Sequence, residues 1–252
     1  MEGNIGSGKS DLLAFLGDGG LGFEVVMEPV ERWRDVGGHN IFEKMYRDPV
    51  RWSALFQQLA QITLLKNHQG WSEGTKVMER SLFSSQYVFA KNLLDTNKME
   101  EAEFRVAEEG FNFMTGCPDL NVRADLVIYL RTSPEVSLER TKQRGRGEEA
   151  GVPLSYLQQL HNRHEAWLIR GEHPRPAHVV VINANQDRAR VREEGRKIME
   201  KVLPQVLSGA TGLPPVSGAL DAGHWALERA LMDENAALFA DLDDADLADL
   251  DH

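Results

Sequence analysis

The chain begins with an octapeptide whose residue types and spacing are typical of a phosphate-binding loop. Residues 3–10 match the pattern G-x-x-x-x-G-K-[ST]. The glycines permit a tight turn whose backbone N–H groups converge on phosphate oxygens, and the helix that follows adds a partly positive N-terminus. We expect Lys9 to reach the β- and γ-phosphates of ATP and the Ser10 hydroxyl to be a ligand of Mg²⁺. The predicted loop residues are Gly3, Asn4, Ile5, Gly6, Ser7, Gly8, Lys9 and Ser10.

Charged side chains directly follow two short apolar segments. Glu28 comes after residues 23–27, and Glu79 and Arg80 come after residues 76–78. A carboxylate at a strand end that faces the phosphate loop can accept the proton of an attacking hydroxyl, so Glu28 is the predicted base. Arg80 is predicted to steady the charge on the transferring phosphoryl group, and Glu79 to lie near Mg²⁺.

A cluster of arginines near residue 144 has the spacing of a lid over a triphosphate. Arg140 and Arg144 lie four residues apart on one predicted helical face, and Arg146 lies just beyond. Several guanidinium groups closing on phosphates would spread the transition-state charge and exclude water. Taken alone, such a cluster is more often a solvated helix end. The phosphate loop in the same chain favours the lid.

These motifs, with three others in the same order, resemble the deoxyribonucleoside kinase family, and within it the insect multisubstrate and mitochondrial thymidine kinase branch. The resemblance runs from Gly3 to about Asn183. It implies an α/β kinase that uses ATP and Mg²⁺ to phosphorylate the 5′-hydroxyl of a deoxyribonucleoside for nucleotide salvage, and that forms a homodimer. The segments that carry it are residues 2–10, 28–34, 45–49, 78–81, 129–135 and 160–168.

The resemblance also implies how a nucleoside would be held. Glu28 would be the base acting on the 5′-hydroxyl beside Arg80, and Tyr46 and Glu149 would hold the 3′-hydroxyl. The predicted residues around the base are Trp33, Gln57, Leu64, Ser85 and Phe89.

The chemistry of the base-binding residues agrees with that implication. The amide of Gln57 can donate and accept at once against a pyrimidine edge, and Phe89 offers a face for stacking. Deoxycytidine and deoxyguanosine kinases place an arginine and an aspartate where this chain has Leu64 and Ser85. Because these residues leave space for a thymine methyl, thymidine and deoxycytidine are favoured over purines.

The elements that must position these residues alternate between strands and helices. Four apolar or β-branched runs predict buried strands, and helical spacing predicts the segments between them. This alternation predicts a phosphate-loop-type parallel sheet with helices on both faces and ligands at the carboxyl ends of the strands. The predicted strands are 23–27, 76–78, 126–130 and 179–182, and the predicted helices are 48–65, 83–95, 99–115, 134–145, 153–170 and 187–206.

One element expected in this architecture is hard to find in the sequence. A phosphate loop should follow a buried strand, yet only Met1 and Glu2 precede Gly3. We therefore expect the first strand to be missing from this chain, and truncation or a faulty start site is the favoured explanation. The alternative is a sheet that forms without its central strand, which would leave apolar faces uncovered and two neighbouring strands unpaired.

Charge and composition divide the chain into a kinase domain, residues 1–207, and an acidic tail, residues 208–252. Of the formal charge of −11, most falls in residues 218–252, which hold ten acidic residues and one arginine. The nearly neutral remainder argues against a nucleic-acid surface. The single cysteine indicates a reducing compartment, cytoplasm or mitochondrion, and no apolar run is long enough to span a membrane. We expect the tail to be disordered.

Several alternatives stay open at this point. Asp11 follows Ser10 where the family usually has a hydroxyl residue, and its charge would oppose ATP if it faced inward. His161 and His164 lie three apart, although packing is a better explanation than a metal site. The chain could also be another phosphate-loop kinase, such as a nucleoside-monophosphate kinase, or an inactive scaffold of the same fold.

Overall fold

The computed structural model describes residues 1–19, 22–70, 72 and 74–208. Apart from Ser208, the predicted acidic tail lies outside these residues. The predicted domain boundary at residue 207 therefore stays a prediction.

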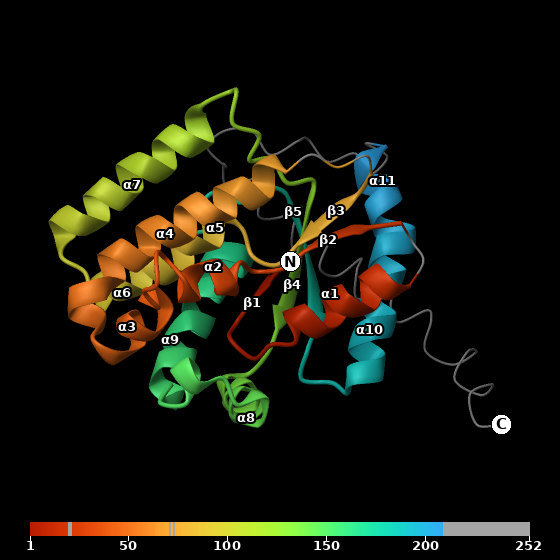
Figure 1. The fold of residues 1–252 in the computed structure, drawn as a ribbon. Coiled ribbons are helices and arrows are strands. Elements are labelled where there is room, and N and C mark those ends of the chain that lie inside the picture. Colours follow the sequence, from red (N-terminus) through yellow and green to blue (C-terminus); the bar gives the residue numbers. More distant parts are fainter. Residues whose placement is uncertain (20–21, 71, 73, 209–252) are drawn as a thin grey trace. The chain divides into compact units, whose positions relative to one another are not determined.

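Five short parallel strands form the centre of the described part of the chain (Figure 1). Hydrogen bonds join them as β1-β4-β5 and β2-β3, with every pair parallel. Met1 connects the two groups, because its α-amino group donates to Met78 O at 2.8 Å and its carbonyl accepts from Arg80 N at 2.9 Å. The strands are β1 Glu2–Gly3, β2 Glu24–Val26, β3 Lys76–Met78, β4 Leu126–Arg131 and β5 His178–Asn183.

The expectation that the first strand is missing needs correction. Residues Glu2 and Gly3 form a two-residue strand, in register with Tyr129 and Leu130 of β4. This pairing places the start of the phosphate loop at the carboxyl end of the sheet, as the chemistry requires. Toward the amino ends of β3 and β4, the strands instead border a cavity of about 730 Å³, whose lining includes Met1, Val77, Met78, Leu126, Val127 and Ile128.

Helices cover both faces of the sheet, as predicted (Figure 1). On one side α1, Lys9–Asp18, packs against α10, Arg188–Lys197, and a π-helical turn at Ile198–Val202 leads into α11, Leu203–Leu207. The contact between α1 and α10 is close at Gly195, where an added Cβ would lie 2.6 Å from Leu12 Cδ1. A larger residue at that point would separate the two helices.

The other side carries the helices that surround the candidate site. The predicted helices of this region are present, and two short helices that we did not predict, α2 and α3, precede them. Helix α4 begins where Asp48 accepts a hydrogen bond from Arg51 N and Pro49 occupies the first turn. The elements are α2 Val30–Arg34, α3 Ile41–Arg47, α4 Pro49–Gln69, α5 Leu82–Ser84, a π-helical turn Ser85–Ala90, α6 Lys91–Asp95, α7 Glu101–Gly116, α8 Pro134–Arg144, a 3₁₀ turn Gly147–Glu149, α9 Leu154–His164 and a π-helical turn Glu165–Ile169.

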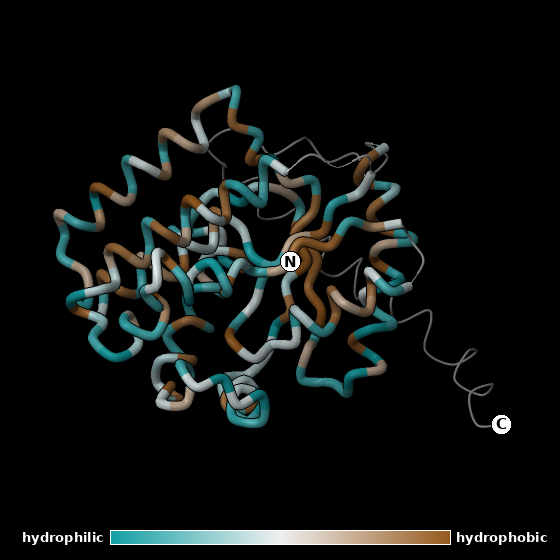
Figure 2. The backbone as a smooth tube through the Cα atoms, viewed as in Figure 1, coloured by the Kyte–Doolittle hydropathy of each residue, from teal (hydrophilic) through white to brown (hydrophobic). Residues whose placement is uncertain are grey.

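The strands are the most hydrophobic part of the described chain, as their brown colour in Figure 2 shows. Residues of β4 are buried between helices from both sides, which explains their continuous apolar run. One core cluster includes Tyr129, Leu157, Leu160, Trp167 and Leu168, all at most 1% exposed. The sheet edge that carries the site is therefore fixed by a well-packed core.

Candidate active site

The phosphate loop wraps from the end of β1 into the first turn of α1. Gly6 has φ of 74°, in the region that favours glycine, and a Cβ there would lie 2.5 Å from Ser137 O. Gly8 forms the N-cap of α1 with φ of 95°. The loop thus has the tight backbone turn and the open helix N-terminus that phosphate binding requires.

Lys9 is 4% exposed and points back along the loop. Its Nζ donates to Gly3 O at 3.2 Å and to Asn4 O at 2.8 Å. Burial, assisted by the positive charge of Arg80, lowers the pKa of Lys9 to about 7. A phosphate group would reverse this effect, because an anion beside Nζ favours the charged form of the lysine.

Glu28 and Arg80 form an ion pair beside the loop. Arg80 Nε lies 2.8 Å from Glu28 Oε1, and Arg80 Nη1 donates to Gly3 O at 3.0 Å. Arg80 has φ of 63°, which is unusual for a residue with a side chain and marks a locally constrained backbone. Burial raises the pKa of Glu28 despite the opposing charge of Arg80. A buried carboxylate of raised pKa is suited to accept a proton near neutral pH.

Glu79 and Ser10 meet at the other side of the loop. Ser10 Oγ donates to Glu79 Oε1 at 2.9 Å and to Oε2 at 3.0 Å. Burial alone would raise the pKa of Glu79, but Lys9, the Ser10 hydrogen bond and Arg80 outweigh it and hold the pKa below its ordinary value. The two side chains therefore offer hard oxygen atoms, one of them charged, which are the ligands that Mg²⁺ prefers.

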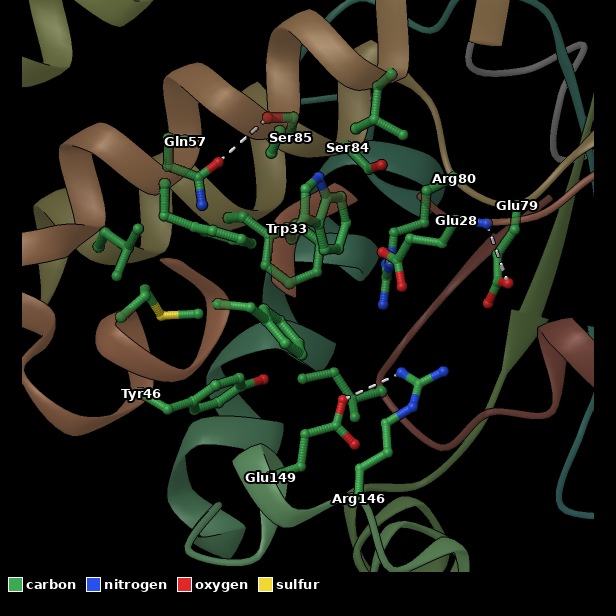
Figure 3. Close-up of a pocket in the computed structure, with 18 of the residues that line it drawn as sticks. Glu28, Trp33, Tyr46, Gln57, Glu79, Arg80, Ser84, Ser85, Arg146 and Glu149 are labelled. Carbon is green, nitrogen blue, oxygen red and sulfur yellow. Dashed lines mark hydrogen bonds and ion pairs between the residues drawn. The ribbon is translucent and has the colours of Figure 1, made fainter. Parts of the chain in front are cut away.

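One cavity joins these charged groups to the residues predicted to hold a nucleoside (Figure 3). Glu28, Glu79 and Arg80 lie together at one end, whereas Gln57 lies at the opposite end. Trp33 lies between them and is fixed by a hydrogen bond from its Nε1 to Thr63 Oγ1 at 2.9 Å. The predicted residues that line the cavity are Ile5, Lys9, Glu28, Trp33, Tyr46, Gln57, Leu64, Glu79, Arg80, Ser85, Phe89, Arg144, Arg146 and Glu149.

The predicted lid residues divide into two groups. Arg144 and Arg146 line the cavity and both pair with the buried carboxylate of Glu149, Arg146 at 3.4 Å. Arg140 does not line it, because its guanidinium donates to Ala184 O at 2.7 Å and to Gln186 O at 3.3 Å. In this structure Arg140 thus connects α8 to the loop after β5.

This geometry agrees with the comparisons with known proteins. The family model for deoxynucleoside kinases matches residues 1–208. The chain belongs to the deoxynucleoside kinase family. It is 40% identical over 205 residues to human mitochondrial thymidine kinase 2, covering 81% of this chain and 76% of that protein.

Two further relatives support the assignment. A probable deoxycytidine kinase of fowlpox virus is 39% identical over 191 residues, covering 74% of this chain and 78% of the viral protein. Mouse deoxycytidine kinase is 32% identical over 231 residues, covering 80% and 88%. The resemblance inferred from the sequence motifs is confirmed, and so is the prediction that the chain is a kinase.

Asp11, the residue unusual for a deoxynucleoside kinase, does not face the phosphate loop. Its carboxylate bonds with the guanidinium groups of Arg188 and Arg192, the latter at 3.0 and 3.1 Å. Burial would raise the pKa of Asp11, but these two arginines lower it. Asp11 therefore connects α1 to α10, and its charge is neutralised before it can oppose a bound triphosphate.

His164 of α9 is a packing residue in this kinase. His164 is fully buried, its ring stacks on Tyr129 with centroids 5.8 Å apart, and its Nδ1 lies 2.7 Å from Leu160 O. Burial keeps the pKa of His164 well below its ordinary value, so the ring stays neutral. Among the described residues no group of three or more histidine, cysteine or acidic side chains could hold a metal ion.

The sequence did not predict the ion pair that holds the 3₁₀ turn Gly147–Glu149, which directly follows the predicted lid arginines. Arg34 of α2 bonds through two nitrogens to Glu148, at 2.8 and 3.0 Å, and this contact lowers the pKa of Glu148 to about 2. Two residues 114 positions apart give no local pattern that could have predicted it. The cavity-lining Ser84 and Tyr156 were missed as well, since they resemble ordinary helix residues.

Proposed function

We propose that this protein transfers the γ-phosphoryl group of ATP to the 5′-hydroxyl of deoxyribonucleosides, with thymidine and deoxycytidine preferred, giving deoxynucleoside monophosphates for nucleotide salvage. The observation that carries the proposal is one cavity with the Glu28–Arg80 pair and Lys9 at one end and an amide among aromatic rings at the other. The family relatives named thymidine kinase and deoxycytidine kinase support the same substrates.

The charged end supplies the groups that phosphoryl transfer needs. The 5′-hydroxyl gives its proton to the carboxylate of Glu28 while its oxygen bonds to the γ-phosphorus, and the bond from that phosphorus to the β,γ-bridging oxygen breaks to release ADP. Arg80 and Lys9 stabilise the negative charge that spreads over the phosphoryl oxygens. Ser10 and Glu79 would hold Mg²⁺, which neutralises phosphate charge when bound.

The middle of the cavity fits a deoxyribose. Tyr46 and Glu149 both line it, and burial raises the pKa of Tyr46 well above its ordinary value, so the phenol stays a hydrogen-bond donor. A 3′-hydroxyl can accept from Tyr46 and donate to Glu149 at the same time. Binding there would compete with Arg144 and Arg146 for the Glu149 carboxylate and free them to reach phosphates.

Around Gln57 most of the side chains that line the cavity are apolar. Leu64, Phe89 and Trp33 line the same cavity, with the Arg80 guanidinium 4.6 Å from the centroid of the Phe89 ring, and Gln57 supplies a donor and an acceptor. Ser85 and Leu64, which also line the cavity, are uncharged and so form no ion pair or charged hydrogen bond with an amino group of the base. These features favour a pyrimidine, with space for the thymine methyl, over a larger purine.

The test is transfer of labelled γ-phosphate from ATP to the four deoxynucleosides, for the wild type, Glu28→Gln and the exposed control Glu135→Gln. We expect pyrimidine phosphorylation that falls by about 10²- to 10⁴-fold in Glu28→Gln, the usual effect of losing a general base. Glu135→Gln should match the wild type. Wild-type inactivity toward all four nucleosides would support the inactive scaffold, and transfer to thymidine monophosphate instead would indicate a nucleoside-monophosphate kinase.

We further propose a homodimer formed through α4 and α7. Each helix exposes a pair of large apolar side chains seven residues apart, Leu55 and Ile62 on α4 and Val106 and Phe113 on α7, and α4 also exposes Val50. The two helices lie side by side, so these side chains can form one apolar face. Most of residues 83–93, within the predicted helix 83–95, are buried, so this segment contributes less to such a face.

Sedimentation of the wild type and Phe113→Glu checks the dimer. The wild type should sediment as a dimer, and the introduced charge should shift it toward a monomer because an uncompensated charge is costly in an apolar interface. Lys142→Glu, on the unrelated helix α8, is the matched control. A monomeric wild type would refute this interface.

A reducing compartment, cytoplasm or mitochondrion, is also part of the proposal, with neither nucleic acid nor membrane as a partner. The human relative is named as mitochondrial. Within the described residues, every helix is too short or too polar to cross a bilayer. Fractionation of cells that express the tagged full chain would distinguish the two compartments.

A further inference from the structure

Two consecutive residues, Glu79 and Arg80, both direct their side chains into the charged end of the cavity (Figure 3). Glu79 Oε1 accepts the Ser10 hydroxyl at 2.9 Å, and Arg80 Nε lies 2.8 Å from Glu28 Oε1. In an extended strand, successive side chains point to opposite faces of the sheet. The backbone departs from this alternation at Arg80, whose φ of 63° is a left-handed conformation that residues with side chains rarely adopt. The site therefore depends on an unfavourable backbone conformation at Arg80.

Hydrogen bonds fix the chain at Arg80 to β1 and to the residue before it. Arg80 N donates to Met1 O at 2.9 Å, and Arg80 Nη1 donates to Gly3 O at 3.0 Å. Ser81 Oγ donates to Glu2 Oε1 at 2.6 Å. The first two bonds end on backbone carbonyls, which any residue type supplies. The third depends on one pair of side chains, so it is the contact that the sequence itself specifies.

Both ends of this side-chain contact belong to fixed elements. Glu2 lies in β1, in register with Tyr129 of β4. Ser81 is the N-cap of α5, where its hydroxyl also accepts from Ser84 N at 3.4 Å. The bond between Glu2 and Ser81 therefore joins the strand that leads into the phosphate loop to the helix that follows Arg80.

The burial of Glu2 is costly for a residue with this single contact. Its side chain belongs to a residue that is 1% exposed, and among the described residues Oε2 has no hydrogen-bond partner. A buried carboxylate with one hydrogen bond costs free energy, so packing alone would favour an apolar residue here. Burial lowers the pKa of Lys9, and the negative charge of Glu2 is among those that oppose this effect. Glu2 thus acts on the charged site although it lies outside the lining of the cavity.

We propose that Glu2 is a positioning residue for phosphoryl transfer, because its carboxylate anchors Ser81, holds Arg80 in the left-handed conformation and so keeps the guanidinium beside Glu28. This inference rests on the proposed function, since it assumes that Arg80 stabilises the transferring phosphoryl group. Without the anchor the backbone at Arg80 relaxes toward an ordinary conformation, and the guanidinium turns away from Glu28.

The first test compares Glu2→Gln with Glu2→Met in steady-state kinetics with ATP and thymidine. Both variants remove the charge at nearly constant side-chain length, but only glutamine keeps an oxygen that can accept from Ser81. Glu2→Met should lower kcat by about 10- to 100-fold, the effect of a misplaced catalytic group, with both KM values within about threefold of the wild type. Glu2→Gln should keep kcat within about threefold. Equal kcat values for the two variants, or a loss confined to KM, would overturn the proposal.

The second test asks whether the effect passes through Arg80. In Arg80→Lys the guanidinium that the anchor positions is absent, so adding Glu2→Met should lower kcat by less than about threefold further. A further loss as large as the one that Glu2→Met causes in the wild type would show that Glu2 acts by another route, and would refute the inference.

Controls separate this inference from the proposed function and from loss of folding. Glu165→Gln alters another buried glutamate that accepts a hydroxyl, from Tyr129 at 2.9 Å, outside the cavity, and should leave kcat of the folded protein unchanged. Thermal unfolding reports whether each variant folds. If Glu2→Met does not fold, kcat should fall in Ser81→Ala and not in Ser81→Thr, which keeps the hydroxyl. Wild-type inactivity toward every nucleoside would refute the kinase proposal itself, whereas an active wild type whose kcat is unaffected by Glu2→Met would refute only the role of Glu2.

Discussion

Replacing Lys9 with methionine should stabilise the folded protein while removing its ATP affinity. Lys9 is buried, and its pKa falls to about 7 because burial, with Arg80 nearby, disfavours the charged form. An unfolded lysine has a pKa near 10.5, the ordinary value. The free-energy cost of keeping Lys9 protonated in the folded protein is therefore full below pH 7 and decreases as the pH rises from 7 toward 10.5. The free energy of unfolding of the wild type should accordingly increase with pH.

The size of the effect follows from these two pKa values. At pH 7 the difference corresponds to about 4 kcal/mol of lost stability, and at pH 9 to about 2 kcal/mol. Methionine removes this cost and also the two hydrogen bonds to Gly3 O and Asn4 O, which contribute about 1 kcal/mol each. Both carbonyls keep another donor, Arg80 Nη1 for Gly3 and Ser7 N for Asn4. The expected net gain at pH 7 is about 2 kcal/mol.

Urea unfolding of both proteins at pH 7 and pH 9 measures this prediction. Other groups titrate between these values, including the α-amino group of Met1, whose pKa is lowered mainly by burial and only to a lesser degree by Lys9, so most of its contribution is common to both proteins. The advantage of the variant should therefore shrink by about 2 kcal/mol between pH 7 and pH 9. Equal pH dependence of the two proteins, or a less stable variant at pH 7, would refute the account of Lys9.

Three further predictions follow from the same structure. ATP binding at pH 8 should be accompanied by uptake of about one proton, because the phosphates restore the positive charge of Lys9. Calorimetry in buffers of different ionisation enthalpy measures this uptake, and a value of zero would contradict the prediction. Gly195→Ala should lower the free energy of unfolding in urea by about 1–3 kcal/mol, because the added Cβ would collide with Leu12. Gly110→Ala, in the middle of α7 with ordinary contacts, should instead raise it by about 0.5–1 kcal/mol. A four-residue Val/Ile extension before Met1 should raise the unfolding temperature more than a Gly/Ser extension does. Both extensions replace the buried amine by an amide, but only Val and Ile favour pairing with β3 and β4 and burial beside the 730 Å³ cavity. Equal unfolding temperatures of the two extended proteins would contradict this prediction.

The sequence predicted helices and strands well where the spacing of apolar residues and the residues at the element's ends indicate the same structure. Helix α4 was predicted from its Asp48-Pro49 start and apolar spacing, and β3 was predicted with its observed bounds, Lys76–Met78. Helices α2 and α3 were not, because five and seven residues are too short to display a helical period. The two-residue β1 was missed for a related reason: its strand character comes from pairing with β4 and from no local preference.

The candidate site could be predicted mainly where its residues belong to motifs. Lys9, Glu28 and Arg80 stand in the loop and at strand ends, and the parallel sheet brings them to one edge. The orientation of Asp11 depended on α10, more than 170 residues away, and the engagement of Arg140 depended on carbonyls of another loop. Such long-range contacts are properties of the packed chain and leave no local trace in composition or spacing.

Buried side chains of opposite charge are clustered in this site. Lys9 and Arg80 are matched by Glu28 and Glu79 within one cluster, so no charge is left without an opposite partner. The balance is nevertheless strained, since burial raises the pKa of Glu28 and lowers that of Lys9, and each is held away from its preferred charged state. A triphosphate would favour the charged lysine, and a nearby hydroxyl would give the carboxylate a proton to accept. The same burial that costs the empty protein stability thus prepares both groups for phosphoryl transfer.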